Sequence, residues 1–134
     1  MEYDIRPFVG IGELKFGETR EALRERLGAT VKPFLKCKTG PLVDAYDSFG
    51  LHLYFDSQDR LEFIETFVPA MTTFAEIHLL GLEVEEANRL LSEIGCSGEP
   101  IDVGYQYDNE GFCLYAPLSI VLAVSAFRRG YYDD

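Results

Sequence analysis

Two nine-residue stretches of this sequence nearly match, Tyr46-Asp-Ser-Phe-Gly-Leu-His-Leu-Tyr54 and Tyr107-Asp-Asn-Glu-Gly-Phe-Cys-Leu-Tyr115. They share tyrosine, aspartate, glycine, leucine and tyrosine at the same five relative positions, 61 residues apart and without a gap. Self-similarity at a fixed spacing is the signature of a repeated structural unit. The 134 residues are therefore predicted to form a single compact domain, 1–134, built of two repeats at about 9–68 and 74–128.

A helix is expected before each repeated stretch. In the first copy Thr19 can cap a helix over residues 20–27, and Gly28 can end it. In the second copy the acidic residues from Glu83 onward suit the first turn of a helix, and Gly95 marks its end. The predicted buried stripe of the second helix is Ala87, Leu90, Leu91 and Ile94.

The segment that joins the two copies leaves two interpretations open. Thr73-Phe-Ala-Glu76 has the spacing of a capping box, which favours the start of a short helix. Residues 77–80 could equally be extended, because their apolar side chains also suit a strand. The sequence does not choose between a helix and a strand here.

Each repeated stretch begins with a turn. Asp47-Ser-Phe-Gly50 and Asp108-Asn-Glu-Gly111 fit four-residue type I turns, which favour aspartate at the first position and glycine at the fourth. A hairpin closed at the second turn pairs Tyr107 with Phe112, Tyr105 with Leu114 and Gly104 with Tyr115. Turn chemistry explains the repeated aspartates and glycines, so the two aspartates are given no catalytic role.

Apolar and polar residues alternate along the strands that follow these turns. A period of two is typical of a strand with one buried face. The predicted inward residues are Leu51, Leu53, Phe55, Phe112, Leu114 and Ala116. A further strand is expected in each copy, at residues 60–67 and 120–126. The second of these is apolar on both faces, which predicts a central position in a sheet.

Together these elements predict an α+β fold. We expect a tandem duplication of a helix plus three-stranded antiparallel meander, forming one curved antiparallel sheet with helices on one face. The other face of the sheet would be open and would present the candidate partner-binding residues. They are His52, Tyr54, Glu62, Thr66, Gln106, Cys113 and Tyr115.

Composition narrows the classes of protein that the chain can belong to. A hydrophobic content of 47% and a charged content of 26% indicate a globular protein rather than a disordered or low-complexity one. The longest apolar run, residues 120–124, falls short of the ~20 residues that cross a bilayer, and the first residues lack the apolar stretch of a signal peptide. The expected location is cytoplasmic, with the three cysteines reduced.

The net charge of −11 is the first indication of a partner. Residues 68–134 carry 3 basic and 11 acidic residues, against 9 and 12 in residues 1–67. Such acidity repels phosphate backbones and anionic lipids, so neither nucleic acid nor membrane is an expected partner. A basic protein would be attracted, and tyrosines such as Tyr54 and Tyr115 suit its interface. Acidity that only keeps the protein soluble is the alternative.

Sequence signatures of catalysis are few. The chain has no glycine-rich phosphate loop, no H-E-x-x-H or G-x-S-x-G motif, and no cysteine or histidine cluster with metal-ligand spacing. No cofactor or metal is therefore expected. The one nucleophile arrangement to test is a dyad of Cys113 and His52, with Glu62 beside it in a cleft between the copies.

The first copy also resembles a known family. Leu14-Lys-Phe-Gly-Glu-Thr-Arg-Glu-Ala-Leu23, Leu27-Gly28, Gly50-Leu-His-Leu-Tyr-Phe-Asp56 and Asp59-Arg-Leu-Glu-Phe-Ile64 resemble the pattern of the small outer-membrane assembly lipoproteins. That resemblance implies a helical pair followed by a three-stranded antiparallel sheet. The tandem form is similar to the beta-lactamase inhibitor proteins, in which two such units make one concave sheet that clasps an enzyme. The resemblance thus implies a sheet that binds a protein.

The sequence as a whole favours a non-enzymatic protein-binding module of the inhibitor or immunity type. Such a module would occlude a basic protein partner, for example a toxin or an enzyme, with its open, acidic, tyrosine-bearing sheet face. Two alternatives stay open. A homodimeric structural or assembly module would close that face against a second copy. A small-ligand binder or hydrolase would use a cleft between the repeats.

Overall fold

Strands make up most of this protein. The computed structural model describes residues 2–28, 31–35 and 41–132, and within these ranges the chain forms thirteen strands and two α-helices. Eight strands form a large sheet, in the order β10 (Glu99–Ile101), β11 (Gly104–Tyr107), β12 (Phe112–Tyr115), β13 (Ala123–Phe127), β7 (Leu61–Phe67), β6 (Leu51–Phe55), β5 (Val43–Tyr46) and β4 (Lys32–Phe34). Five form a small sheet, in the order β3 (Leu14–Lys15), β2 (Gly10–Ile11), β1 (Glu2–Arg6), β8 (Met71–Phe74) and β9 (Ile77–His78).

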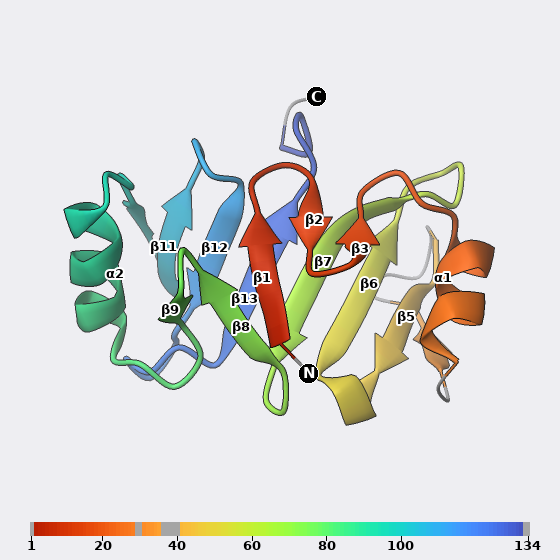
Figure 1. The fold of residues 1–134 in the computed structure, drawn as a ribbon, viewed down its shortest axis with the longest axis horizontal. Coiled ribbons are helices and arrows are strands. Elements are labelled where there is room, and N and C mark those ends of the chain that lie inside the picture. The colour runs from red at the N-terminus through yellow and green to blue at the C-terminus, as the bar shows by residue number, and fades with distance from the viewer. Residues whose placement is uncertain (1, 29–30, 36–40, 133–134) are drawn as a thin grey trace.

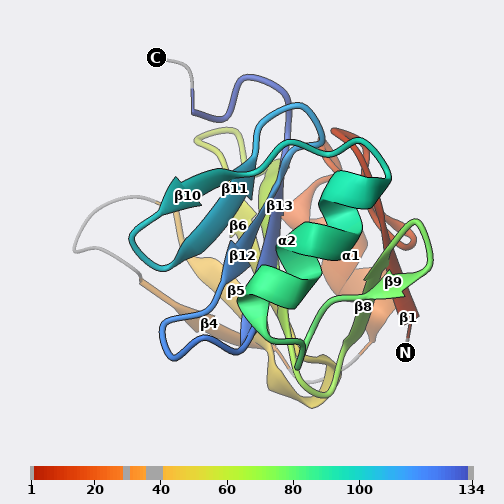
Figure 2. The ribbon, with the colours of Figure 1, turned by 90° about the vertical axis from the view of Figure 1, so that its left-hand side faces the viewer.

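The small sheet and both helices cover the same face of the large sheet (Figure 1). α1 (Arg20–Leu27) lies at the end that carries β5 and β6, and α2 (Val84–Glu93) lies at the end that carries β11 and β12. The edge strands β4 and β10 curve away from the small sheet (Figure 2). The face of the large sheet that is turned away from the helices, here named the outer face, is therefore concave.

The predicted fold class is wrong in its repeated unit and in its number of sheets. The sequence predicts one sheet made of two three-stranded meanders, whereas the structure has two sheets and four strands in each meander of the large one. The protein is mostly β rather than α+β. The antiparallel arrangement is confirmed for the large sheet, in which every neighbouring pair of strands is antiparallel.

The two strands missing from the predicted meanders, β4 and β10, are the edges of the large sheet. All their residues are exposed, so no alternation of apolar and polar residues marks them in the sequence. Pro33 and Pro100 occupy their central positions, and proline is tolerated in a sheet mainly at an edge because it has no N–H to donate. The same prolines hinder pairing with a further strand.

The small sheet joins the N-terminus to the middle of the chain. β1 pairs in parallel with β8, with Tyr3 opposite Thr72, and β2 and β3 are only two residues long. Short strands with distant partners leave no local pattern to predict from. The segment between the two predicted repeats is extended, because β8 and β9 form a hairpin whose turn residues Ala75 and Glu76 have positive φ. Of the two interpretations of this segment, the strand is thus confirmed.

The hairpin predicted for the second repeated stretch is confirmed in its register. Tyr107 lies opposite Phe112, Tyr105 opposite Leu114 and Gly104 opposite Tyr115. In the first stretch residues 47–49 form a short 3-10 helix, and the Gly50 N–H donates to the Asp47 carbonyl at 3.1 Å. Gly50 has a φ of +70°, and a Cβ there would lie 2.0 Å from the Phe67 carbonyl oxygen. Only glycine fits this turn.

Both helices form where the sequence places them. The Thr19 side chain accepts a hydrogen bond from a backbone N–H in the first turn of α1, and Gly28 ends the helix in the left-handed conformation. The Glu83 carboxylate caps α2 by accepting from two backbone N–H groups. The predicted buried stripe of α2 is wrong at Ile94, which is 50% exposed because the helix ends one residue before it.

The core lies between the two sheets and the helices. Its fully buried large side chains are Ile11, Leu23, Tyr46, Leu51, Leu53, Leu61, Ile64, Leu79, Leu91, Tyr107, Phe112 and Leu114. β13 lies between β12 and β7, which confirms the central position predicted for the strand that is apolar on both faces. Neither described helix has the length and hydropathy needed to cross a bilayer.

Candidate functional site

The register of the large sheet defines which residues lie on the outer face. Residues directly opposite each other on neighbouring strands share a face, and successive residues of a strand alternate between faces. The Tyr107 hydroxyl donates to Asn88 of α2 at 2.8 Å, so Tyr107 faces the helix and its neighbour Gln106 faces outward. One row across the outer face therefore consists of His52, Glu65, Ser125, Cys113 and Gln106.

Five of the seven predicted residues lie on the outer face. They are His52, Tyr54, Gln106, Cys113 and Tyr115. Tyr115 is 43% exposed, whereas Tyr54 is half-buried. Burial raises the pKa of the Tyr54 hydroxyl to about 12, and the neighbouring Glu65 adds to the shift. Both rings can be reached by a partner, and the Tyr54 hydroxyl stays protonated at neutral pH.

Aromatic rings form a layer over the centre of the outer face. Tyr54 packs edge-on against Phe63 with ring centroids 5.0 Å apart, and Phe63 lies 5.0 Å from Tyr131. Tyr132 packs edge-on against Phe127 at 4.9 Å. Aromatic pairs of this kind contribute about 0.5–1.5 kcal/mol beyond the burial of their area. The segment after β13 is thus held against the sheet by its two tyrosines.

His52 lies between two carboxylates and two rings. Its Nε2 is 3.3 Å from Asp47 Oδ1, and its Nδ1 is 3.3 Å from Glu65 Oε1. The rings of Phe34 and Phe67 pack edge-on against the imidazole, with centroids at 5.4 and 4.8 Å. These four contacts fix the orientation of the imidazole and engage both of its nitrogens.

Cys113 is poorly suited to nucleophilic attack. Burial raises the pKa of its thiol to about 11, so the thiol is protonated at neutral pH. Its Sγ donates to Gln106 Oε1 at 3.5 Å. Cys113 and His52 occupy the same row but lie three strand spacings apart, about 14 Å at the usual separation of strands. The dyad considered from the sequence does not form.

Glu62 lies beside the segment that follows β13. Its Oε1 is 3.4 Å from a guanidinium nitrogen of Arg128. Burial raises the pKa of the Glu62 carboxyl, and the charge of Arg128 acts in the opposite direction. Glu62 thus ties the start of the C-terminal segment to β7, and it does not project from the sheet as a free carboxylate.

Thr66 lies on the opposite face from the one predicted. It is fully buried, and its hydroxyl donates to the Val124 carbonyl at 3.2 Å and accepts from the Thr72 hydroxyl at 2.6 Å. The register of β6 against β7 shifts between Tyr54 and Phe55, which breaks the strict alternation that the prediction assumed. Thr66 therefore links the two sheets and takes no part in the outer face.

The outer face also holds residues that the sequence prediction missed. They are Phe63, Glu65, Phe67, Ser125 and Phe127, together with Tyr131 and Tyr132 of the C-terminal segment. β7 carries polar and apolar residues on both faces, so its own alternation does not show which face points outward. The adjacent tyrosines near the C-terminus were the one visible signal, since tyrosine is enriched at the energetically important positions of interfaces.

A cavity of about 440 Å³ lies between the C-terminal segment and the outer face. Its lining residues are Phe8, Gln106, Asp108, Phe127, Arg129, Gly130, Tyr131 and Tyr132. The Arg129 guanidinium lies 4.1 Å above the centre of the Phe8 ring. Aromatic rings beside a carboxylate are a favourable environment for a cation, as Arg129 shows within this chain.

Among residues 2–28, 31–35 and 41–132, no three histidine, cysteine, aspartate or glutamate side chains lie together as a metal site requires. No protein-family model, curated protein or solved structure gives a significant match to this chain.

Proposed function

We propose that this protein is a non-enzymatic binding module of the inhibitor or immunity type that occludes a basic protein partner with its outer face. The observation that carries this proposal is a concave face of eight strands on which neither described helix packs (Figure 2). Aromatic rings line this face. A concave sheet contacts a convex partner over many residues at once. Tyrosine supplies a large contact area and a hydrogen-bonding tip at little entropic cost.

Charge supports a basic partner over an acidic one. The chain carries a net charge of −11, and the outer face contributes Glu65, next to His52 in its polar row, and Asp108 beside its cavity. The nearby Arg128 is already paired with Glu62. Opposite potentials speed the encounter of two proteins and exclude partners of the same sign. A lysine or arginine of the partner would approach Asp108, which accepts a hydrogen bond from Gln106 at 2.6 Å, on the side of the cavity away from Arg129.

The outer face is tested by affinity capture with matched variants. The wild-type chain, a Tyr54→Ala/Tyr115→Ala variant and a Tyr105→Ala variant are immobilised, and retained proteins are identified by mass spectrometry. The affinity of each retained protein is then measured after purification. Tyr105 belongs to the same hairpin as Tyr115 but faces α2, where its hydroxyl donates to Glu85. Loss of ~1–3 kcal/mol per interface tyrosine would weaken binding of the double variant at least tenfold.

Four outcomes would contradict the proposal. Equal affinity of the double variant and the wild type would remove the outer face as the contact surface. Equal weakening by Tyr105→Ala would show that the substitutions act through the fold, which circular dichroism would check. A purified partner with a net negative charge would overturn the electrostatic part of the argument, as would binding that 0.5 M salt leaves unchanged.

Self-association is the second candidate, and exposed apolar residues at one end of the large sheet favour it. Val68 is 73% exposed directly after β7, and Leu122 is 48% exposed directly before β13, where these two strands pair. Leu118 in the preceding connection is 82% exposed. Light scattering during dilution to micromolar concentration separates the two candidates. A stable dimer would keep twice the chain mass of 15.2 kDa, whereas a monomeric binding module would show the mass of one chain.

A further inference from the structure

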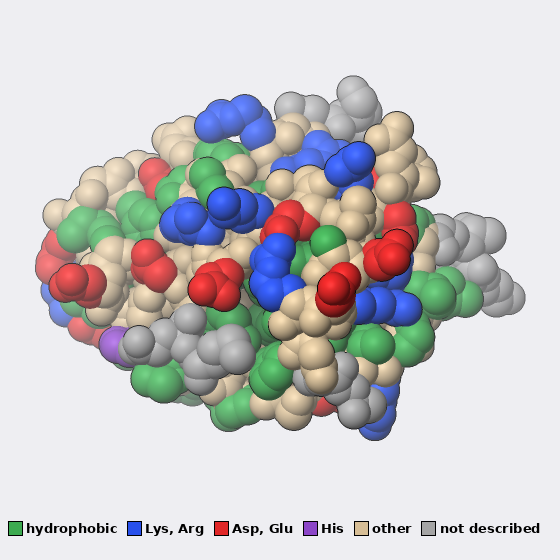
Figure 3. Space-filling view, turned by 45° about the vertical axis from the view of Figure 1, so that its right-hand side comes forward, with side chains coloured by type: hydrophobic (Ala, Val, Ile, Leu, Met, Phe, Trp, Pro, Cys, Tyr) green, Lys and Arg blue, Asp and Glu red, His purple; other side chains and the backbone are tan. Residues whose placement is uncertain are grey.

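A second candidate site lies on the other side of the molecule, where the small sheet meets α1. Lys and Arg side chains gather there among Asp and Glu side chains (Figure 3). A cavity of about 360 Å³ is lined by Arg6, Gly12, Glu13, Lys15, Glu18 and Arg26. Three of its six lining residues are cationic, in a chain whose net charge is −11. This local excess of positive groups needs an explanation.

The register of the small sheet brings two of these cations to one surface. Arg6 lies opposite Gly10 and Gly10 lies opposite Lys15, so Arg6 and Lys15 share the outward face of the sheet with a glycine between them. Gly10 has a φ of +155°, and a Cβ there would lie 1.8 Å from the Leu14 carbonyl oxygen. The backbone thus excludes any side chain from the space between the two cations.

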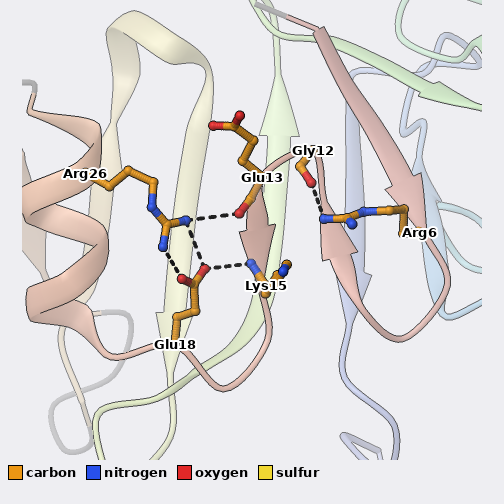
Figure 4. A pocket seen from close by; sticks show the side chains of 6 residues that line it. All are labelled: Arg6, Gly12, Glu13, Lys15, Glu18 and Arg26. Atoms are coloured by element: carbon orange, nitrogen blue, oxygen red, sulfur yellow. Dashed lines mark hydrogen bonds and ion pairs between the residues drawn. The ribbon is translucent and has the colours of Figure 1, made fainter.

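The acidic residues of the cavity form no direct ion pair with Arg6 or Lys15, although the Lys15 backbone N–H donates to Glu18 at 2.9 Å and the Lys15 charge attracts the same carboxylate. Arg26 is engaged with Glu18, and it also donates to the Glu13 carbonyl oxygen at 3.0 Å (Figure 4). Hydrogen bonding to Arg26 holds the pKa of the Glu18 carboxyl below its ordinary value. Arg6 donates to the Gly12 carbonyl, and neither Arg6 nor Lys15 forms an ion pair with a described carboxylate. Their charges can therefore serve an external anion.

An apolar cavity of about 410 Å³ adjoins the cationic one. The two share Gly12, Glu13 and Arg26, and the second is completed by Tyr3, Leu14, Leu27 and Phe49. Tyr3 is 3% exposed, and its hydroxyl has no hydrogen-bond partner among the described residues. Burial raises the pKa of this hydroxyl to about 12, so it is a donor at neutral pH. A buried donor without an acceptor is costly, and an oxygen of a ligand would satisfy it.

We infer that the two cavities form one binding site for a small organic oxyanion, a carboxylate or phosphate ester with an apolar body. Arg6 and Lys15 bind the anionic group, and Arg26 lies at the border of the two cavities. The apolar body packs against Leu14, Leu27 and Phe49. The Tyr3 hydroxyl donates to an acceptor on the ligand. This site is separate from the outer face and does not depend on the proposed partner.

The probe for this site is phenyl phosphate, titrated into the full chain and followed by calorimetry and by amide NMR shifts. Saturable binding with shifts at Gly12, Lys15 and Leu27 is the expected result. Arg6→Gln and Lys15→Gln should each weaken binding about tenfold, as loss of a charge-assisted hydrogen bond does. Tyr3→Phe should weaken it about threefold, the effect of a neutral hydrogen bond. Benzoate tests whether a carboxylate can replace the phosphate. Benzyl alcohol has the apolar ring without the anionic group, and inorganic phosphate has the anionic group without the ring, so these two compounds test the two halves of the site separately.

Arg89→Gln is the matched control, because it removes one positive charge from an exposed position on α2, where Arg89 pairs with Glu86 and Glu93. Equal weakening by Arg89→Gln would show that only net charge matters and would overturn the site. Binding of inorganic phosphate as tight as that of phenyl phosphate would overturn the apolar half. Absence of saturation with both phenyl phosphate and benzoate would overturn the whole proposal. The Tyr54→Ala/Tyr115→Ala variant should bind the probe normally, so failure of either proposal is distinguishable.

Discussion

The two halves of the large sheet have the same strand order but hold their helices by different interactions. In the first half α1 packs beside β4–β7, and in the second half α2 packs beside β10–β13, with β7 and β13 adjacent at the centre. The α1 half uses buried charges to attach its helix. The α2 half uses apolar packing and tyrosine hydroxyls. The two helices are therefore attached to the large sheet by chemically different interactions.

The attachment of α1 centres on Asp44 of β5, which is fully buried. Arg20 and Arg24 of the helix both bind its carboxylate, with nitrogen to oxygen distances of 2.7 Å. The Arg20 guanidinium also donates to Asp59 at 2.8 Å and lies 4.2 Å above the centre of the Phe55 ring. One carboxylate is thus shared by two guanidinium groups. This cluster fixes α1 on the sheet, although few of its side chains are apolar.

The attachment of α2 rests on an apolar stripe instead. Val84, Ala87 and Leu91 are buried against the sheet. Tyr107 is fully buried and donates to Asn88 of the helix at 2.8 Å. The charged residues of α2 face solvent, where Arg89 pairs within the helix. The α1 half therefore depends on complete pairing of buried charges, and the α2 half depends on packing.

The largest effect is expected in the α1 half. Asp44→Asn removes the negative charge that compensates Arg20 and Arg24, and breaking a buried ion pair costs about 3–5 kcal/mol of unfolding free energy. Urea unfolding followed by circular dichroism measures the change. Asp59→Asn is the matched control, because its carboxylate also pairs with Arg20 but is 56% exposed. Exposed pairs contribute about 0–1 kcal/mol, so equal losses in the two variants would contradict the contrast between them.

The next effect is expected in the α2 half. Leu91→Ala removes a fully buried side chain and should cost about 2–5 kcal/mol, because a cavity remains in the core. The same urea titration measures it. Ile94→Ala, in the half-exposed residue after the helix, should change stability by less than about 1 kcal/mol. Loss of stability by Ile94→Ala as large as that by Leu91→Ala would restore the stripe predicted from the sequence and would contradict the exposed position of Ile94.

The smallest effect on stability is expected from raising the pH, which ionises the thiol of Cys113. Cys113 occupies the place in the second half that His52 occupies in the first. Its pKa is raised to about 11 by burial, so its neutral thiol is favoured in the folded state. The resulting stability is fully present below the pKa of an unfolded thiol, about 8.5, and is lost as the pH rises toward 11. At pH 8 the alkylation of Cys113 should be about 100-fold slower in the folded chain than in the chain unfolded by urea.

Site-resolved mass spectrometry after iodoacetamide treatment measures this rate separately for each cysteine. Cys96, which is buried and also has a raised pKa, provides the internal comparison. Rapid alkylation of Cys113 in the folded chain would contradict the burial of its thiol. It would also reopen the nucleophilic role that the distance from His52 argues against.

Parts of the fold could be predicted because they depend on neighbouring residues. The Thr19 cap and the Gly28 stop bounded α1 correctly, since capping involves contacts within one helical turn. The Asp108 to Gly111 turn set the hairpin register for the same reason. The burial of Thr66 could not be predicted in this way, because the register shift between β6 and β7 breaks the simple alternation along β7. Edge strands with central prolines also gave no periodic signal.

By itself, the sequence determined the two helices, the hairpin turns, the alternation along β6 and β12, and the acidity of the chain. Only the tertiary structure decided that β1 pairs with β8, that Tyr131 and Tyr132 cover Phe63 and Phe127, and that Arg6 and Lys15 meet across Gly10. The physical reason is the range of the forces involved. Caps and turns are fixed by a few adjacent residues, whereas strand pairing and side-chain burial are fixed by the whole chain at once.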